Sequence, residues 1–185
     1  ESALYSQFDL SKSLFEQPNE PQEQWVPVYL CPSDMARGRF YNDWWYTNGK
    51  NVAKANYAAF TSPFHTDLQL VYPGALISTG QKVAKVTDGT SHTLVFSEVR
   101  TLDHLEDERG AWALAFNGAS LLAADVHHDN DRGVFRSYDP FRETAYQAQL
   151  PNSLGPNADV LTRCVENLVV EAQLEQMPCV VGNFI

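Results

Sequence analysis

The densest group of side chains able to do chemistry lies in a polar segment that begins at Asp125 and reads Asp-Val-His-His-Asp-Asn-Asp-Arg-Gly. Asp129, Asp131 and Gly133 match the start of a calcium-binding loop, in which alternate side chains supply oxygen ligands and a glycine permits the sharp turn. A complete loop of that kind needs a bidentate acid twelve positions from its start, where Pro140 stands. The match is therefore partial. If a hard cation such as Ca²⁺ binds, Asp125, Asp129 and Asp131 are its predicted oxygen donors, and the alternative is a solvated turn.

Zinc binding and catalysis find less support in the sequence. His127 and His128 are neighbours, and on a strand they would face opposite ways, so they could not both bind one ion. The chain contains none of the serine-hydrolase, zinc-protease, phosphate-loop or dinucleotide-binding patterns. Asp88, Ser91 and His92 have the residue types of a catalytic triad, but neighbours on a strand point to opposite faces. We therefore expect no enzyme active site.

Charge and composition limit the partners that the chain can have. It carries 13 Lys and Arg against 23 Asp and Glu, which gives a formal net charge of −10, and no basic cluster offsets this excess. Because such a surface repels phosphate, nucleic acid is excluded as an expected partner. A length of 185 residues with 44% hydrophobic content predicts a single globular domain over residues 1–185.

The elements of the chain are organised around Val83–Val99, which predicts two short strands joined by a turn at Asp88 and Gly89. Gly89 accepts a positive φ, and the Asp88 side chain can bond nearby backbone N–H groups. After the turn, apolar residues recur on both faces with the period of a strand covered on both sides. Glu98 in this strand is either exposed or buried and hydrogen-bonded, and we interpret it as a structural anchor.

The remaining segments predict few regular elements. Glu1–Phe8 has the apolar spacing of a short helix, and Asp159–Gln176 that of a longer one. The run from His104 to Arg109 is most simply a solvated loop. Short strands are predicted at four further places: Trp25–Cys31, Ala55–Phe60, Trp112–Phe116 and Leu121–Ala124.

An aromatic excursion over residues 32–54 separates two of these predicted strands. It contains Phe40, Tyr41, Trp44, Trp45 and Tyr46 between glycine-punctuated turns. One interpretation is an aromatic platform, with Trp44, Trp45 and Tyr46 contacting a sugar or a neighbouring subunit. The other is a small satellite core held under a loop.

Several of these segments also carry motifs of a known family. Thr87–Leu94 with Glu98 resembles the "TDGTSNT…E" signature of the large prepilin-like family abundant in planctomycetes, labelled a domain of unknown function or a solute-binding-protein-type domain. Tyr29–Asp34 resembles its "LCPSD" motif and Ala55–Ala58 its "NYA" motif. Ala3–Asp9 resembles the segment that follows its membrane helix. His92 departs from the family's usual asparagine.

This resemblance implies an α+β fold, a pilin-like head in which an N-terminal helix stub packs on a mainly antiparallel sheet with long loops. Family members start with a pilin-type helix and end with a His and Asp-Gly motif, so we expect this chain to be the head of a longer protein. The resemblance implies an extracytoplasmic structural subunit, at the cell surface or secreted. Its partners would be copies of itself or other pilin-like subunits, and it would meet the membrane only through the missing helix.

Cysteine content leaves two alternatives. The chain has three cysteines and no Cys-x-x-Cys pair, and all three could be small buried residues. In the family context, which is extracytoplasmic and oxidising, we favour a disulfide between Cys164 and Cys179. The alternative function is a surface module that binds a glycan or small ligand, with Ca²⁺ as its candidate cofactor, through Trp44, Trp45 and the Asp125–Asp131 cluster.

Overall fold

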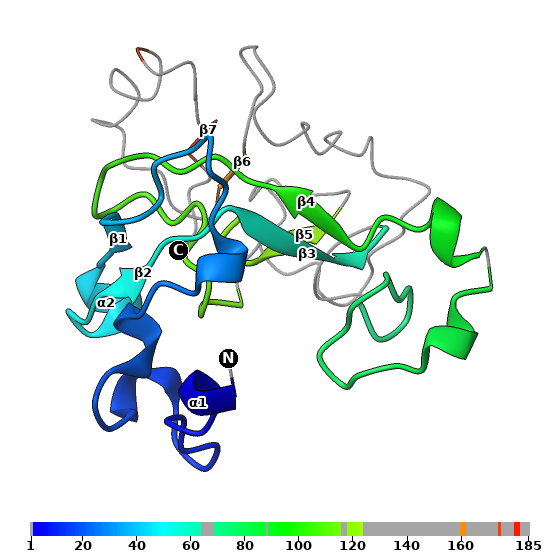
Figure 1. The fold of residues 1–185 in the computed structure, drawn as a ribbon, viewed down its shortest axis with the longest axis horizontal. Helices are drawn as coiled ribbons and strands as arrows, with labels where there is room; N and C mark the ends of the chain where they lie inside the picture. The colour runs from blue at the N-terminus through cyan, green and yellow to red at the C-terminus, as the bar shows by residue number, and fades with distance from the viewer. Residues whose placement is uncertain are drawn as a thin grey trace.

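The computed structural model describes residues 2–63, 69–87, 89–115 and 118–123, together with Val160–Leu161, Leu174 and Val180–Val181. Its helices are short. They are the α-helices α1 (Ser2–Tyr5) and α2 (Trp44–Thr47) and the 3₁₀ helices η1 (Leu14–Glu16), η2 (Pro21–Glu23), η3 (Pro27–Tyr29), η5 (Val83–Lys85) and η6 (Thr90–His92). The strands are β1 (Phe40–Tyr41), β2 (Val52–Ala53), β3 (Tyr57–Ser62), β4 (Phe96–Glu98), β5 (Leu121–Ala123), β6 (Val160–Leu161) and β7 (Val180–Val181). The predicted α+β class is confirmed (Figure 1).

The central sheet has the order β4-β3-β5. Strand β4 runs antiparallel to β3 with Ala58 opposite Ser97, whereas β5 runs parallel to β3 with Phe60 opposite Leu122. The register shifts between Phe60 and Ser62, where β3 bends away from β5. A second, two-stranded antiparallel sheet joins β1 to β2, and β6 and β7 form a parallel pair. The central sheet is thus mixed, because β3 has an antiparallel partner on one side and a parallel partner on the other.

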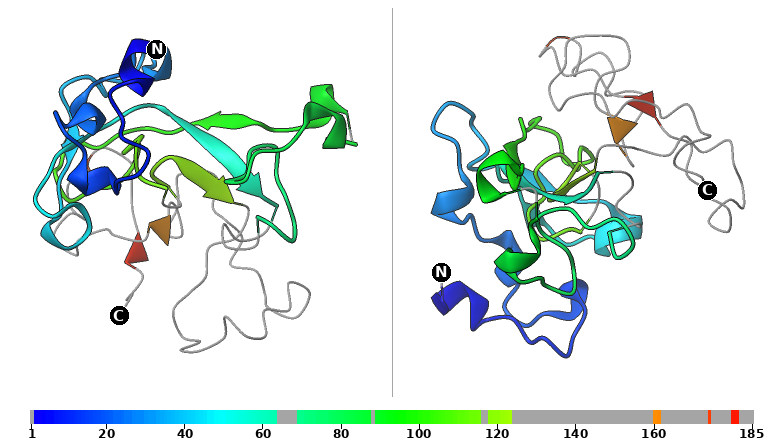
Figure 2. Two further views of the ribbon diagram at one scale, coloured as in Figure 1. Left: turned by 90° about the horizontal axis from the view of Figure 1, so that it is seen from below. Right: turned by 90° about the vertical axis from the view of Figure 1, so that its right-hand side faces the viewer.

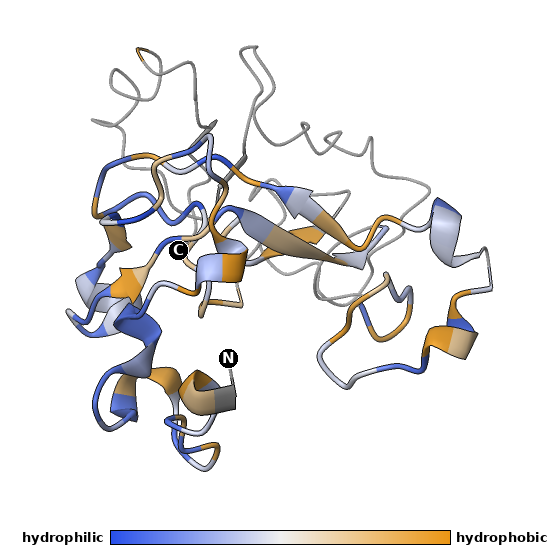
Figure 3. Cartoon of the chain, viewed as in Figure 1, coloured by the Kyte–Doolittle hydropathy of each residue, from blue (hydrophilic) through white to orange (hydrophobic). Residues whose placement is uncertain are grey.

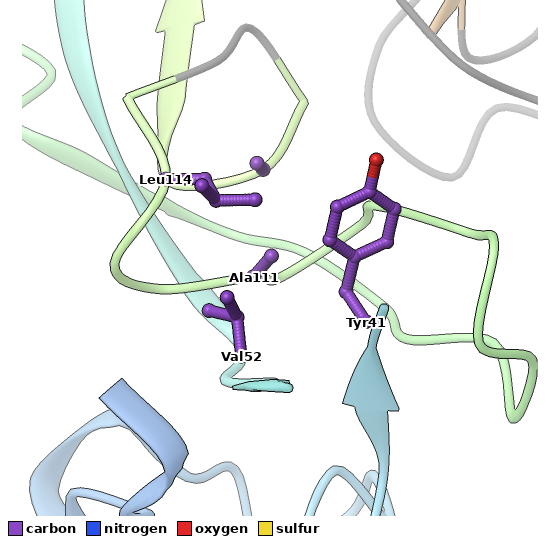
Figure 4. Packing of buried hydrophobic residues seen from close by; sticks show 5 residues of the cluster. Tyr41, Val52, Ala111 and Leu114 are labelled. Atoms are coloured by element: carbon purple, nitrogen blue, oxygen red, sulfur yellow. The ribbon is translucent and has the colours of Figure 1, made fainter. Parts of the chain in front are cut away.

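Two apolar clusters hold these sheets. Tyr41 and Val52 from β1 and β2 pack with Ala111, Leu114 and the Ala119 methyl group (Figure 4). A smaller cluster on the central sheet comprises Ala58, Val99 and Leu122, with Phe60 packed against it. The small residues allow the backbones to approach closely, and burial of the larger side chains contributes about 1.5–3 kcal/mol each.

Strand predictions were confirmed where apolar residues pair within the central sheet. The segment predicted at Ala55–Phe60 forms β3, shifted by two residues, and the one predicted at Leu121–Ala124 forms β5. Thr93–Val99 supplies β4, which is shorter than predicted. Its expected burial on both faces is wrong, because Leu94 and Phe96 are 57% and 55% exposed.

Three other strand predictions were wrong. Trp25–Cys31 contains η3, in which Pro27 takes the first helical position that its fixed φ favours. The first half of the predicted hairpin forms η5, whose i+3 bonds satisfy its backbone locally. The segment that begins at Trp112 forms no strand in its described part: Ala111 makes an isolated bridge to Lys54, and the Trp112 N–H donates to the Ala53 carbonyl at 3.3 Å.

The predicted helix Asp159–Gln176 does not start where expected, since Val160–Leu161 is strand β6. Most of the remaining predicted helix lies outside the described residues. The N-terminal prediction is confirmed in part by α1. Its continuation reaches the body through Phe8, whose ring meets Trp112 edge-on at 6.1 Å between centroids. Among the helices of the described residues, none combines the length and apolar character needed to cross a bilayer.

Candidate functional site

The predicted aromatic contact residues lie on α2, at one end of the molecule in Figure 1. Asp43 caps this helix, and its Oδ1 accepts from the backbone N–H groups of Trp45 at 2.8 Å and Tyr46 at 3.3 Å. The helix ends at Asn48, which is left-handed with φ of 53°. Such a short helix depends on its caps, because it has almost no internal hydrogen bonds of its own.

Trp44 and Trp45 project from this capped turn and are 72% and 83% exposed. The Trp44 ring lies over Gly49, where an added Cβ would come within 3.0 Å of Trp44 Cε3. The other half of the aromatic excursion faces inward: Tyr41 is fully buried, and the Phe40 ring packs against Trp25 with 4.6 Å between centroids and the ring planes tilted by 53°. The excursion therefore divides into a core part and an exposed aromatic part.

The predicted metal ligands Asp125, Asp129 and Asp131 lie outside the described residues, as do the disulfide candidates Cys164 and Cys179. Within the described part of the chain, no group of three or more metal-binding side chains occurs. The third cysteine, Cys31, is free and buried. Its Sγ lies 2.9 Å from Ser33 Oγ.

At the predicted turn, Asp88 lies outside the described residues, while Gly89 has the expected positive φ of 88°. Ser91 Oγ lies 3.1 Å from His92 Nδ1, because these residues form the 3₁₀ helix η6 and not the predicted strand. Both side chains are exposed. Glu98 lies on β4 opposite Tyr57, and its side chain is exposed, so any anchoring role rests on its backbone pairing.

A partly buried polar junction, here called the Asp34 junction, joins two of the family motifs, "LCPSD" and "NYA". Asp34 Oδ2 accepts from Asn56 Nδ2 and, at 3.1 and 3.0 Å, from the backbone N–H and hydroxyl of Thr101. Asn56 Oδ1 accepts from the Cys31 N–H at 2.9 Å. Arg39 completes the junction, 3.7 Å from Asp34 Oδ1 and donating to the Thr101 carbonyl. Four separate chain segments meet here through hydrogen bonds that include charged groups, which are the strong kind.

A second buried junction, the Lys54 junction, is made of charged groups. Lys54 Nζ donates to the carbonyls of Leu102 at 2.7 Å and His104 at 2.9 Å, and lies 3.8 Å from Asp107 Oδ1. Arg109 holds the same carboxylate through Nε at 3.1 and 3.0 Å and through Nη2 at 2.7 Å. Burial lowers the pKa of Lys54 to about 8, and the neighbouring Asp107 opposes that shift.

The solvated loop predicted for 104–109 is therefore wrong for its second half. Asp107, Glu108 and Arg109 are each at most 1% exposed. A buried carboxylate is stable only when it is paired and hydrogen-bonded, and Asp107 has both cations within reach. Sequence reasoning missed Lys54 as well. The available signal was its place between small apolar residues, Val52-Ala53-Lys54-Ala55, where a lysine is unusual unless paired.

Neither junction is arranged for a reaction. The Lys54 ammonium donates hydrogen bonds to two backbone carbonyls, and the Asp107 carboxylate accepts from Arg109. Lys54 and Asp107 therefore make a structural contact. The motif residues Asp34 and Asn56 serve the same purpose, binding backbone groups of distant segments. The exposed aromatic helix α2 is the described feature best suited to contact another molecule.

One comparison with known proteins identifies a family. The model of the SBP_bac_10 family, described as "Protein of unknown function (DUF1559)", matches residues 1–164. No curated protein and no solved structure matches the chain.

Proposed function

The chain belongs to the DUF1559 family, and from this premise we propose that it is a structural, pilin-like subunit that works outside the cytoplasm through protein–protein contacts. One observation carries the proposal. The polar residues of two of its family motifs, Asp34 and Asn56, are committed to the partly buried Asp34 junction. What the described surface offers to other molecules is instead apolar: the exposed side chains of Trp44 and Trp45 on α2.

The physical logic is that of a scaffold. Buried ion pairs and amide networks add little net stability but fix one arrangement of the segments that they join. A subunit that must present a constant outer surface benefits from such fixing. Partners of this kind are copies of the chain or other pilin-like subunits.

The test uses the full-length open reading frame, tagged and expressed in its own host. We expect the tagged protein to be labelled by a membrane-impermeant biotin reagent and to crosslink in cells to itself or to a pilin-like subunit. Deleting the N-terminal helix that the family resemblance implies should release the labelled protein from the membrane fraction and leave the head folded. A protein that stays unlabelled in intact cells, together with cytosolic markers, would exclude the proposal.

A second candidate function is a glycan- or small-ligand-binding surface module. Exposure of 72% and 83% for two adjacent tryptophans is the observation that favours it, because sugar rings stack on such faces. Calcium titration followed by thermal melting tests the metal-dependent version, with an Asp125→Asn, Asp129→Asn, Asp131→Asn triple variant as its control. A melting temperature unmoved by EDTA and by millimolar Ca²⁺ would remove that version.

A further inference from the structure

We propose that residues 69–94, here called the arm, dock on the α2 end of a second copy of this chain. This inference rests on the proposed structural function and names the contact by which heads would associate. It starts from the position of the arm. Figures 1 and 2 show this green segment projecting from the central sheet at the end of the molecule opposite α2.

The base of the arm is tied to β3. Gly74 donates to the Thr61 carbonyl at 2.8 Å and Leu76 to the Phe60 carbonyl at 3.1 Å. An added Cβ on Gly74 would lie 2.6 Å from the Thr61 carbonyl carbon, so only glycine permits this approach. Gln81 then donates to the carbonyls of Gly74 and Ala75. The arm therefore leaves the sheet in a defined direction.

The arm exposes apolar side chains along its length. Val83 on η5 is 71% exposed, Val71 66%, Leu70 63% and Leu94 57%. Figure 3 shows apolar residues at the corresponding turns. Lys82 and Lys85 flank Val83, and both are exposed. Residues 69–94 hold these two lysines and one aspartate, whereas the whole chain has a net charge of −10. The arm is thus an apolar and weakly basic extension of an acidic protein.

The α2 end has the complementary character. The Trp44 ring lies against Gly49, and the next residue, Lys50, places its Nζ 3.4 Å from Glu20 Oε1, so an acidic side chain is held close to the segment that carries the exposed tryptophans. Burial and the nearby Glu20 raise the pKa of Glu23, which places two acidic side chains close together at this end of the molecule. Lys82 and Lys85 of a second copy would supply the missing cations, and Val83 would meet the indole faces.

The two surfaces cannot meet within one copy, since they lie at opposite ends of the molecule in both views (Figures 1 and 2). Docking an arm onto a different copy's α2 end is a heterologous contact. Such a contact leaves one free arm and one free α2 end, and repetition produces an open-ended row. A row of heads is the arrangement that a structural subunit requires.

The test compares two single variants of the 1–185 chain, each measured alone and then mixed with the other. Val83→Asp disables the arm and Trp45→Ala the α2 end, and both side chains are exposed, so the fold is expected to persist. Mass is followed by light scattering against concentration at ~0.15 M salt, where the net charges of two copies are largely screened. The average mass of the wild type should rise with its concentration. Each variant alone should lose about tenfold or more in association constant, as for a contact at the centre of an interface.

A one-to-one mixture of the two variants should recover dimers and stop there, because only one intact pair of surfaces remains. Met35→Asp is the matched control, since Met35 is 75% exposed and lies in neither surface. A photoreactive phenylalanine analogue at position 83 should crosslink to residues 42–51 of an isotopically distinct copy.

Four outcomes would overturn the inference. The first is a wild-type mass that does not rise with concentration, with no intercopy crosslink from position 83; the second is a mixture of the two variants that stays monomeric while the wild type associates. The third is oligomers that Val83→Asp leaves unchanged, and the fourth is binding to anionic vesicles through Val83 without self-association, which would make a lipid surface the partner. None of these outcomes affects the cell-labelling and helix-deletion test of the proposed function.

Discussion

Lys54 keeps a charge where no side-chain surface is exposed, and this has a consequence for pH. Its pKa is about 8 in the folded chain against an ordinary value of 10.5, because burial penalises the ammonium. Below pH 8 both states hold the proton. Between the two values the unfolded chain binds more protons than the folded chain, so the free energy of unfolding rises with pH.

We predict that the wild type gains stability relative to Lys54→Met when the pH is raised from about 7 to about 9.5. Urea unfolding of both proteins at each pH measures this difference. The matched control is Lys50→Met, which removes a lysine paired with Glu20 at the surface. An equal pH dependence for both variants would show that Lys54 is not the responsible group.

The Asp34 junction makes a second prediction at the same scale. Asn56→Asp would place a carboxyl group against Asp34 Oδ2, which now accepts from the Asn56 amide. Two carboxylates at hydrogen-bond distance cannot both ionise, so the pKa of the introduced group is raised. The folded variant then binds more protons than its unfolded chain, and its stability falls as pH rises.

We therefore expect Asn56→Asp to lower the free energy of unfolding more at about pH 7 than at about pH 4.5, as measured by urea unfolding. Asn48→Asp is the control, because Asn48 is an exposed left-handed residue that aspartate tolerates. The interpretation fails if the two variants show the same change with pH.

At the scale of elements, β2 and β3 are joined by a backbone crossing with no room for a side chain. Gly110 has φ of +78°, its carbonyl accepts from the Ala55 N–H at 2.7 Å, and an added Cβ would collide with the Ala55 carbonyl oxygen and lie 2.8 Å from Thr101 Cγ2. Gly80 has a similar φ of +67° but nothing within 4 Å of an added Cβ. The two positions therefore separate the cost of a positive φ from the cost of a steric clash.

Gly80→Ala should lose about 1–2 kcal/mol, the price of a left-handed alanine. Gly110→Ala should lose that amount and at least about 1–3 kcal/mol more, from overpacking against fixed backbone. Chemical denaturation of both variants measures the difference. Equal losses would mean that the backbone at Gly110 can move aside.

Secondary-structure elements could be predicted from the sequence where the conformation depends on residues close together in the chain. The strand predicted at Ala55–Phe60 overlaps β3, and the positive φ of Gly89 follows from residue type. The Val83 segment has equally β-prone residues but folds as η5, since strand formation depends on a partner strand that the sequence does not specify.

The buried junctions show the same limit for the candidate site. Asp107 and Arg109 appear as solvated charges in sequence, and their partner Lys54 is 53 and 55 positions away. Only the fold brings them together. The aromatic run was likewise divided by tertiary structure, with Tyr41 in the core and Trp45 outside, although both are aromatic residues in one polar excursion.

For the whole molecule, the short segment from β2 to β3 connects both sheets and both junctions. Lys54 belongs to one junction and Asn56 to the other, with one residue between them. A defect in either junction should therefore loosen both sheets together. The prediction that residues 1–185 form a single domain can be tested on this point.

Asp107→Asn removes the carboxylate shared by Lys54 and Arg109, and we expect it to lower the free energy of unfolding by about 3–5 kcal/mol because a buried ion-pair network loses a charge. Native-state hydrogen exchange measures which backbone amides lose protection in this variant. The amide of Lys54, bonded to the Arg39 carbonyl at 3.1 Å, and that of Phe60, bonded to the Val95 carbonyl at 3.0 Å, represent the two sheets. In a single cooperative unit both opening free energies fall by the same amount, whereas the exposed-site control Glu98→Gln leaves both unchanged. A loss confined to the Lys54 amide would divide the head into two independently opening parts.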